Sequence, residues 1–370
     1  MGIRTFKADR FRCLVDVDLE FDPRYNLIYG KNASGKTSLL EALAYLGRGK
    51  SFRGAPTQSI VQHGENDFVL FGRVAGGARE RGIGVRNGRD SLEIRIDGDS
   101  VSGVAALAEL LPLQVIDPEV HNLVAGGPEQ RRRFLDWMVF HVEHEFLGVW
   151  RRFRRVLKQR NSLLKRGVTA RELDSWDEEF VSLAGQIDTI RLRVLELAIP
   201  VLEETASALL EDEVGLAYHR GWKADLDLDA ALGASRERDL QLGSTQVGPH
   251  RAELKILANE RQARRLVSRG QQKLLASALI LGGSEVVQTA IERPLVLLLD
   301  DPAAELDKDS LQRILAGAIG LGTQLIVTSL DPEIIAFPEP PRTFHVEHGV
   351  IYRVDDQRRA RSRAASDPGD

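Results

Sequence analysis

Cysteine and long apolar runs are scarce in this chain of 370 residues. Its single cysteine, Cys13, cannot form an internal disulfide, which is typical of a protein of the reducing cytosol. The N-terminal segment carries charges every few residues and has no apolar core of signal-peptide length. The longest purely apolar stretch, around residues 295–299, is far too short to span a bilayer. We therefore expect a cytoplasmic protein with no membrane partner.

The composition excludes wholesale disorder, because 43% of the residues are hydrophobic and 28% are charged. The length suggests roughly two domains of ordinary size. A formal net charge of −4 hides an asymmetry, since twelve basic residues outnumber three acidic ones between Arg131 and Arg171, a local charge of +9. Forty arginines against ten lysines suit phosphate recognition, although a genome-wide codon bias explains that ratio equally well.

Strand-like patterns occupy both ends of the chain. Apolar residues alternate with period two from Cys13 to Phe21, as in a half-buried strand. Residues 26–29 lead into a glycine-rich loop that a helix follows, and short segments from Phe68 to Val101 predict antiparallel strands. The segments PLVLLLDD and TQLIVTSL resemble buried parallel strands.

Two series of apolar residues, at alternating spacings of three and four, predict long helices in the middle of the chain. The first series is Leu135, Val139, Val142, Phe146, Val149, Phe153 and Val156, and the second is Leu173, Trp176, Phe180, Leu183, Ile187, Ile190, Val194, Leu197 and Val201. Joined by a short turn, they should pack as a short antiparallel coiled-coil hairpin, although two amphipathic helices of an ordinary helical lobe would share the pattern. Pro200 should kink or end the second helix.

These patterns predict an α/β fold that is interrupted by a helical insert. We expect the α/β domain to comprise residues 1–115 and 242–352, and the insert to comprise residues 116–241. The polar tail at 353–370 is expected to be disordered.

A phosphate-binding loop stands between the predicted strand at 26–29 and the following helix. It fits the pattern G-x-x-x-x-G-K-[ST], whose backbone wraps closely enough to aim several N–H groups at the phosphates of a nucleotide. Lys36 would bridge the terminal phosphates, and the Thr37 hydroxyl would ligate Mg²⁺. The alternative is a glycine-rich structural turn. The predicted ATP-binding residues are Gly30, Lys31, Asn32, Ala33, Ser34, Gly35, Lys36, Thr37 and Ser38.

Two carboxylates follow the apolar stretch at 295–299, at the edge where doubly wound sheets place their ligands. Asp300 would hold Mg²⁺ through water, and Asp301 would polarise the attacking water. Asp301 and Lys36 are therefore the predicted catalytic residues. The alternative is a buried strand that ends at a solvated acidic turn.

Further segments resemble the motifs of ABC-type ATPases, whose P-loop head is an α/β fold. Residues 266–273 are similar to the signature motif, which in that family contacts the γ-phosphate held by the opposite subunit. Residues 302–307 resemble the D-loop at the dimer seam, and LPLQVIDPE contains a candidate for the Q-loop glutamine that senses Mg²⁺. The implied site residues are Ser268, Gly270 and Gln271 of the signature, Glu305 and Asp307 of the D-loop, and Gln114. Taken alone, the signature could be a helix cap and the glutamine could be structural.

Lys36 and Asp300 are 264 residues apart, which is far more than in a compact transporter subunit. The excess is the predicted hairpin region, an arrangement that resembles heads of the structural-maintenance-of-chromosomes (SMC) type. The chain is identified as a member of the RecF family by the segments NASGKTSLLEA, GGPEQRRRFLD, GPHR, GQQK and LDDPAAELD. The resemblance extends to about residue 352. It implies a bacterial recombination mediator that acts with RecR and RecO to load the recombinase onto gapped DNA.

Three departures from the ABC pattern predict slow, switch-like hydrolysis. Arg269 stands where transporters have glycine, and Asp301 is one methylene shorter than the usual glutamate. Ser329 ends the predicted strand in place of a switch histidine, so that only a hydroxyl could sense the γ-phosphate there. We therefore expect a weak DNA-dependent ATPase.

The basic segment supplies the candidates for DNA contact. Its arginines flank the first apolar series and should project outward, forming either a phosphate-tracking surface or an ordinary solvated helix face. The candidates are Arg131, Arg132, Arg133, Arg151, Arg152, Arg155 and Lys158. We predict an ATP-driven homodimer that binds duplex DNA with a single-strand gap or junction. The alternatives are an SMC-like structural DNA clamp with negligible turnover, and a transporter subunit.

Overall fold

The computed structural model of the chain describes residues 2–76, 79–88, 91–167, 170–304 and 306–354. It divides into two compact units, the first comprising Met1–Glu119 with Glu292–Asp370 and the second Val120–Ile291. Two corrections to the expected boundaries follow: the first falls a few residues later than 115, and the second lies at 291 instead of 241.

The first unit contains a six-stranded antiparallel sheet in the order β2-β1-β4-β5-β6-β7. Its strands are β1 (Gly2–Asp9), β2 (Val17–Glu20), β4 (Asp67–Ala75), β5 (Glu80–Gly88), β6 (Leu92–Ile96) and β7 (Asp99–Ser100). The predicted antiparallel strands between Phe68 and Val101 are thus confirmed. The alternation that begins at Cys13 overextends β2, because Cys13 and Val15 are exposed and precede the strand.

A second sheet of the first unit has the order β15-β14-β3-β13-β12-β8, with only β15 antiparallel to its neighbour. Its strands are β3 (Tyr25–Tyr29), β8 (Leu113–Ile116), β12 (Val296–Leu299), β13 (Gln324–Ser329), β14 (Arg342–Glu347) and β15 (Val350–Arg353). Every residue of β8, β12 and β13 is buried, as expected for central parallel strands. The carboxyl ends of these strands therefore share one edge with the end of β3.

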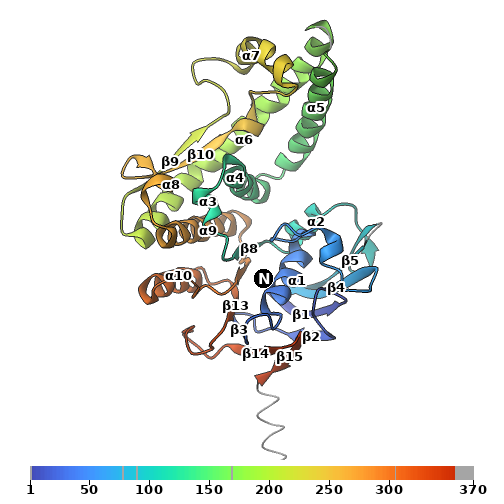
Figure 1. Cartoon of the computed structure of the whole chain (residues 1–370), viewed down its shortest axis with the longest axis vertical. Coiled ribbons are helices and arrows are strands. Elements are labelled where there is room, and N and C mark those ends of the chain that lie inside the picture. The colour runs from blue at the N-terminus through green and yellow to red at the C-terminus, as the bar shows by residue number, and fades with distance from the viewer. Residues whose placement is uncertain (1, 77–78, 89–90, 168–169, 305, 355–370) are drawn as a thin grey trace, which may run out of the picture. The chain divides into compact units, whose positions relative to one another are not determined.

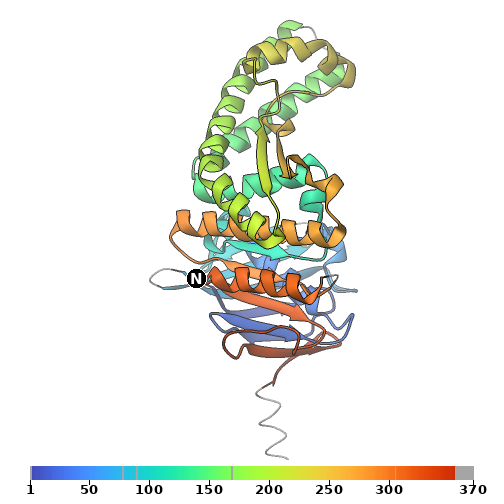
Figure 2. The same cartoon turned by 90° about the vertical axis from the view of Figure 1, so that its left-hand side faces the viewer.

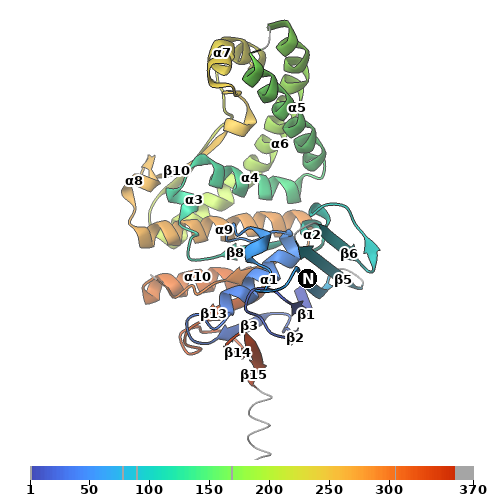
Figure 3. The same ribbon diagram turned by 45° about the vertical axis from the view of Figure 1, so that its right-hand side comes forward.

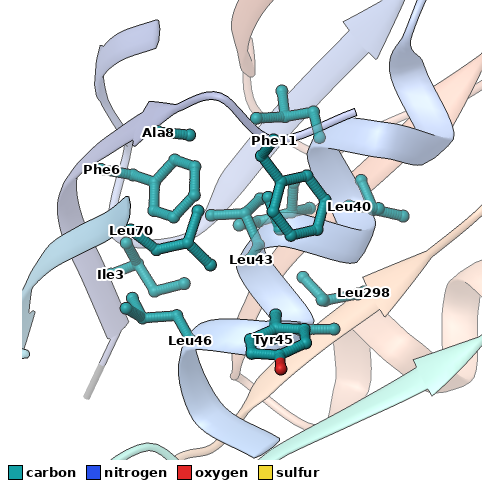
Figure 4. Close-up of a cluster of buried hydrophobic side chains, with 14 of the residues drawn as sticks. Ile3, Phe6, Ala8, Phe11, Leu40, Leu43, Tyr45, Leu46, Leu70 and Leu298 are labelled. Carbon is teal, nitrogen blue, oxygen red and sulfur yellow. The ribbon is translucent and has the colours of Figure 1, made fainter. Parts of the chain in front are cut away.

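Helix α1 (Lys36–Arg48) lies between the two sheets and forms the centre of the hydrophobic core. Leu40, Leu43 and Leu46 of α1 pack with Phe6 and Leu70 of the antiparallel sheet, while Leu298 approaches from the parallel sheet (Figure 4). Helix α10 (Lys308–Gly320) lies along the other face of the parallel sheet (Figure 2). The remaining helices of this unit are η1 (Thr57–Ser59) and α2 (Ala105–Leu110).

The second unit is mainly helical but contains a small antiparallel sheet in the order β11-β10-β9. Its strands are β9 (Val214–His219), β10 (Glu253–Ala258) and β11 (Arg261–Gln262). Its helices are α3 (Asn122–Ala125), α4 (Pro128–Val142), α5 (Phe146–Arg166), α6 (Ala170–Leu210), α7 (Leu228–Leu242), η2 (Pro249–Arg251), α8 (Ala263–Leu266) and α9 (Arg269–Ile291). The expected boundary at residue 242 is wrong because β10 pairs with β9 and α9 packs on α6.

Helices α5 and α6 run side by side as the expected hairpin (Figure 1). The first apolar series, however, spans two helices, because the chain leaves the helical conformation at Glu143 between α4 and α5. Helix α6 also continues through Pro200, so the expectation that this proline might end the helix is wrong.

The strict heptad pattern of α6 fails toward its C-terminal end. Leu197 is 64% exposed, and the buried stripe passes instead through Leu195, Ala198, Leu202 and Ala206. A straight helix turns once in 3.6 residues, so a 3.5-residue pattern drifts off the buried face over several turns. The small residues of this stripe permit the close approach of α9, where a Cβ built at Gly282 would lie 3.3 Å from the Leu202 side chain.

One helix within the described parts of the chain, α9, is long and apolar enough by composition to cross a membrane. Most of its apolar window, 72%, is buried inside the structure. That degree of burial is typical of the core helix of a globular unit.

Candidate nucleotide site and DNA surface

The loop between β3 and α1 wraps tightly, and several of its residues have backbone angles or close contacts that favour glycine. Ala33 has φ 61° and Gly35 has φ 116°, and a Cβ at Gly30 would lie 2.3 Å from the carbonyl oxygen of Val346. Gly35 caps α1 without any side-chain hydrogen bond, so the N–H groups of the first turn, which includes Thr37 and Ser38, keep no side-chain acceptor. These groups form an anion site at the positive end of the helix.

The side chain of Lys36 lies inside the phosphate-binding loop. Its Nζ donates hydrogen bonds to the carbonyl oxygens of Gly30 at 2.7 Å and Lys31 at 3.0 Å. Burial lowers the pKa of Lys36, while the charges of Asp301 and Asp300 oppose that shift. The loop therefore holds a buried cation close to two carboxylates, as a site for phosphate oxygens and Mg²⁺ requires.

Asp300 and Asp301 are positioned by two threonines from different elements. The hydroxyls of Thr37, on α1, and Thr328, on β13, donate to Asp300 Oδ1 at 3.0 Å and 2.8 Å. The backbone N–H of Asp301 donates to Thr328 Oγ1 at 2.8 Å, and Asp301 has a strained φ of 46°. Burial raises the pKa of Asp300, although the two hydroxyl bonds lower it. Thr328 thus fixes both acidic residues, a role that sequence reasoning missed.

The site residues fit Mg²⁺ and a nucleoside triphosphate. The Thr37 hydroxyl and the Asp300 carboxylate are hard oxygen ligands, which Mg²⁺ takes together with phosphate oxygens. Ser34 Oγ is buried in the loop without a hydrogen-bond partner in the described structure, so a polar group of a ligand could satisfy it. Lys31 and Asn32 are exposed at the mouth of the loop.

Gln114 does not lie at the edge of the sheet that carries these acids, which corrects its expected role beside Mg²⁺. It pairs with Leu297 inside β8, and its buried Oε1 accepts a hydrogen bond from Arg48 at 2.9 Å. Asp117 occupies the edge instead, because Ile116 pairs with Leu299. Burial and the charge of Asp300 raise the pKa of Asp117 to about 6. The two carboxyl groups are therefore close enough for the charge of one to affect the protonation of the other.

Two further predicted residues already have local partners. Ser329 is buried, and its hydroxyl donates to the backbone oxygen of Asp331 at 2.7 Å. Asp307 caps α10, and its carboxylate accepts from the N–H and the hydroxyl of Ser310, which lowers its pKa. Glu305, the other D-loop prediction, lies outside the described residues.

The predicted signature segment forms the start of α9 in the second unit. Ser268 Oγ accepts from the N–H of Gln271 at 3.3 Å, and Gln271 Oε1 accepts from the N–H of Ser268 at 2.9 Å. This reciprocal pair is a capping box, with Gly270 in the first helical turn. The cap accounts for the local sequence, and contact with a partner's nucleotide stays a prediction.

The DNA candidates on α4 divide by burial. Arg131 is buried, and its guanidinium binds Glu253 and three backbone carbonyls, so its predicted DNA contact is wrong. Arg132 donates to the carbonyl of Ala252 at 2.7 Å. Arg133 is exposed and forms an ion pair with Glu129 one turn away. The α4 arginines therefore mainly brace the small sheet.

The candidates on α5 lie on its solvent-exposed face, opposite the buried Phe153 and Val156. Only one of them has an ion-pair partner within the described structure, an exposed glutamate on α6 at 3.4 Å from Arg152. Arg160 belongs to the same basic segment but is fully buried between Asp177 and Asp239. The exposed candidates are Arg151, Arg152, Arg155 and Lys158.

Comparison with known proteins identifies the family. A family model for the RecF/RecN/SMC N terminal domain matches residues 2–351. The chain is 41% identical to the DNA replication and repair protein RecF of Cellvibrio japonicus, covering 95% of this chain and 99% of the relative. It is 40% identical to the protein of that name from Pseudomonas aeruginosa, covering 95% and 97%.

Solved structures agree with this assignment. The structure of the recombination mediator protein RecF-ATP in the RecFOR pathway matches with a TM-score of 0.86 and 27% identity, covering 95% of this chain and 97% of that one. An Smc head bound to the C-winged helix domain of ScpA shares the fold alone, with a TM-score of 0.58 and 14% identity over 97% of this chain and 100% of the other. The predicted ABC-type head with a helical insert is thereby confirmed, and the chain belongs to the RecF family.

Proposed function

We propose that this chain is a cytoplasmic recombination mediator that binds ATP and Mg²⁺, pairs with a second copy, and holds gapped or junction DNA until hydrolysis resets it. The observation that carries the proposal is the connection of the phosphate loop to the acidic pair through Thr37, Asp300 and Thr328. The RecF-ATP relative supports the choice of nucleotide.

Each site residue has a distinct role in this proposal. Lys36 exchanges its carbonyl contacts for the terminal phosphate oxygens, and the free N–H groups of α1 bind the same phosphates. Thr37 and Asp300 hold Mg²⁺, which offsets phosphate charge when bound. Asp301 accepts a hydrogen bond from the attacking water and orients it. Thr328 fixes the backbone of Asp301, and the short side chain limits the reach of its carboxylate, which favours slow, switch-like turnover.

The signature-like segment supports the proposed pairing with a second copy. The first turn of α9, with Ser268, Gly270 and Gln271, is the candidate anion site for the partner's nucleotide. A two-fold arrangement lets each copy complete the nucleotide site of the other, and it doubles the exposed basic face of α5. RecR, with RecO, is the proposed protein partner, as the RecFOR pathway of the relative suggests.

Phosphate release measured with and without gapped duplex tests the enzymatic part. We expect slow release from wild type, faster release with DNA, and none above background from Lys36→Met. Lys223→Met, an exposed lysine of the second unit, is the matched control and should behave as wild type. Equal phosphate release from Lys36→Met and wild type would contradict the proposal, and ATP-dependent DNA binding without any release would favour the SMC-like clamp.

A further inference from the structure

The outer face of the antiparallel sheet contains a concavity of about 430 Å³ over β4, β5 and β6. Figure 3 shows β5 and β6 on the side of α1 away from α10. Ile83 and Val85 of β5 point into the core, so the intervening Gly82 and Gly84 lie on the outer face. These two glycines form the floor of the hollow, which we name the β5 trough.

Neither glycine of the trough is required by the fold. Neither has a positive φ, and the pairing of β5 with β4 and β6 runs without a bulge. A Cβ at Gly82 would lie 3.6 Å from the Phe71 ring, and one at Gly84 would lie 3.9 Å from the Arg95 Cβ, both ordinary contact distances. Because glycine weakens a strand, it remains there chiefly where a ligand or another backbone approaches closely.

Three arginines, two acidic residues and one phenylalanine line the trough beside its glycines: Arg73, Arg81, Arg95, Glu80, Asp97 and Phe71. Phe71 pairs with Gly84, which pairs with Arg95, so these residues form one row on the outer face, and the Phe71 ring reaches toward Gly82, where a Cβ would lie 3.6 Å from it. Arg73 pairs with Gly82 in the next row. Arg73 and Arg95 are exposed, and neither makes a hydrogen bond or ion pair with a described residue. Arg81, by contrast, is paired with Asp97.

We propose that the β5 trough binds single-stranded DNA, with a base stacked on Phe71 and the backbone phosphates at Arg73 and Arg95. Arginine beside an exposed aromatic ring is the combination that single-strand binding grooves use. A base pair inside a duplex does not expose its face, so the partly exposed ring favours an unpaired nucleotide. This inference rests on the proposed DNA-binding function and assigns the unpaired part of a gap to the first unit.

Binding of the full-length protein to labelled oligonucleotides, with ATP and Mg²⁺, tests the inference. The probes are a single strand, a gapped duplex and an intact duplex of equal length. Arg73→Ala with Arg95→Ala should weaken single-strand and gap binding by about tenfold and flatten the single-strand salt slope by about 1.4, the value for two lost phosphate contacts. Intact-duplex affinity should stay at the wild-type value.

A second variant fills the trough without removing charge. Gly84→Thr should weaken single-strand binding while keeping or raising the melting temperature, because threonine suits a strand better than glycine. Arg86→Ala, on the same strand but paired with Asp67 outside the trough, is the control and should bind as wild type.

The outcomes separate this inference from the proposed function. Wild-type single-strand and gap binding in both trough variants would overturn the trough assignment alone. An equal loss of duplex affinity would overturn the choice of a single strand. Failure of wild type to bind any of the probes would overturn the DNA-binding function itself, and the trough assignment with it.

Discussion

Acidification should selectively destabilise the second unit through His250, in the GPHR segment. The ring lies beside Phe153 and Phe180, and its Nε2 lies 3.0 Å from the carbonyl oxygen of Thr245. Its Nδ1 is buried without a partner in the described structure. Burial, with the charges of neighbouring arginines, lowers the pKa of His250 to about 4 from 6.5. The folded unit therefore holds this imidazole neutral.

The sign and size of the effect follow from that shift. The unfolded chain binds a proton to His250 below pH 6.5, whereas the folded unit binds it only near pH 4. The contribution of the neutral His250 ring to the free energy of unfolding is therefore fully present above pH 6.5 and is lost as the pH falls toward 4. At pH 5, the linkage relation gives a loss of about 2 kcal/mol from this residue alone.

Urea unfolding of wild type and His250→Gln, at pH 7.5 and pH 5, isolates this contribution. All four tryptophans, Trp137, Trp150, Trp176 and Trp222, lie in the second unit, so their fluorescence reports its unfolding. The wild-type free energy of unfolding, relative to the variant, should fall by about 2 kcal/mol at the lower pH. A difference that stays constant between the two pH values would refute the argument, because other titrating groups affect both proteins alike.

Three further predictions concern the site and its support. Asp301→Asn should reduce phosphate release while ATP binding stays near wild type by fluorescent-nucleotide titration; equal turnover would remove Asp301 from catalysis. Arg160→Met should destabilise the second unit by about 3–5 kcal/mol in urea unfolding, because it leaves the fully buried Asp239 without its cation, and a change below 1 kcal/mol would contradict that ion pair. Changing Arg151, Arg152 and Arg155 of α5 to alanine should flatten the salt slope of duplex binding by about 2–3 units. An unchanged slope would mean that the duplex binds at another surface.

The motifs that are continuous in the sequence were the ones that sequence reasoning could locate. The loop from Gly30 to Thr37 and the pair Asp300 and Asp301 combine residues that are adjacent along the chain with clear strand and helix signals. Thr328 and Asp117 were missed because only the register of β12 with β13 and β8 brings them beside Asp300. A strand alignment made from the sequence could have found them, since each follows an apolar run directly.

Charge counting was less informative than motif reading because it ignores burial. Arg131 and Arg160 contribute to the +9 segment, yet each is buried and paired with carboxylates that lie outside that segment. The predicted domain boundary near residue 242 was wrong because strand character alone does not show which sheet a strand joins. The chain from residue 242 regains strand character, but β10 pairs with β9 instead of joining the sheets of the first unit.

ATP should join two copies of the chain through the start of α9, and light scattering of the purified protein tests this pairing most directly. Mass should double in ATP and Mg²⁺ but not in ADP, and Ser268→Arg should stay a monomer in both. Asp227→Ala removes the side-chain cap of α7 in the same unit, so it controls for the loss of a helix cap and should still pair. Equal masses of wild type in ATP and ADP, or undiminished pairing of Ser268→Arg, would contradict the account.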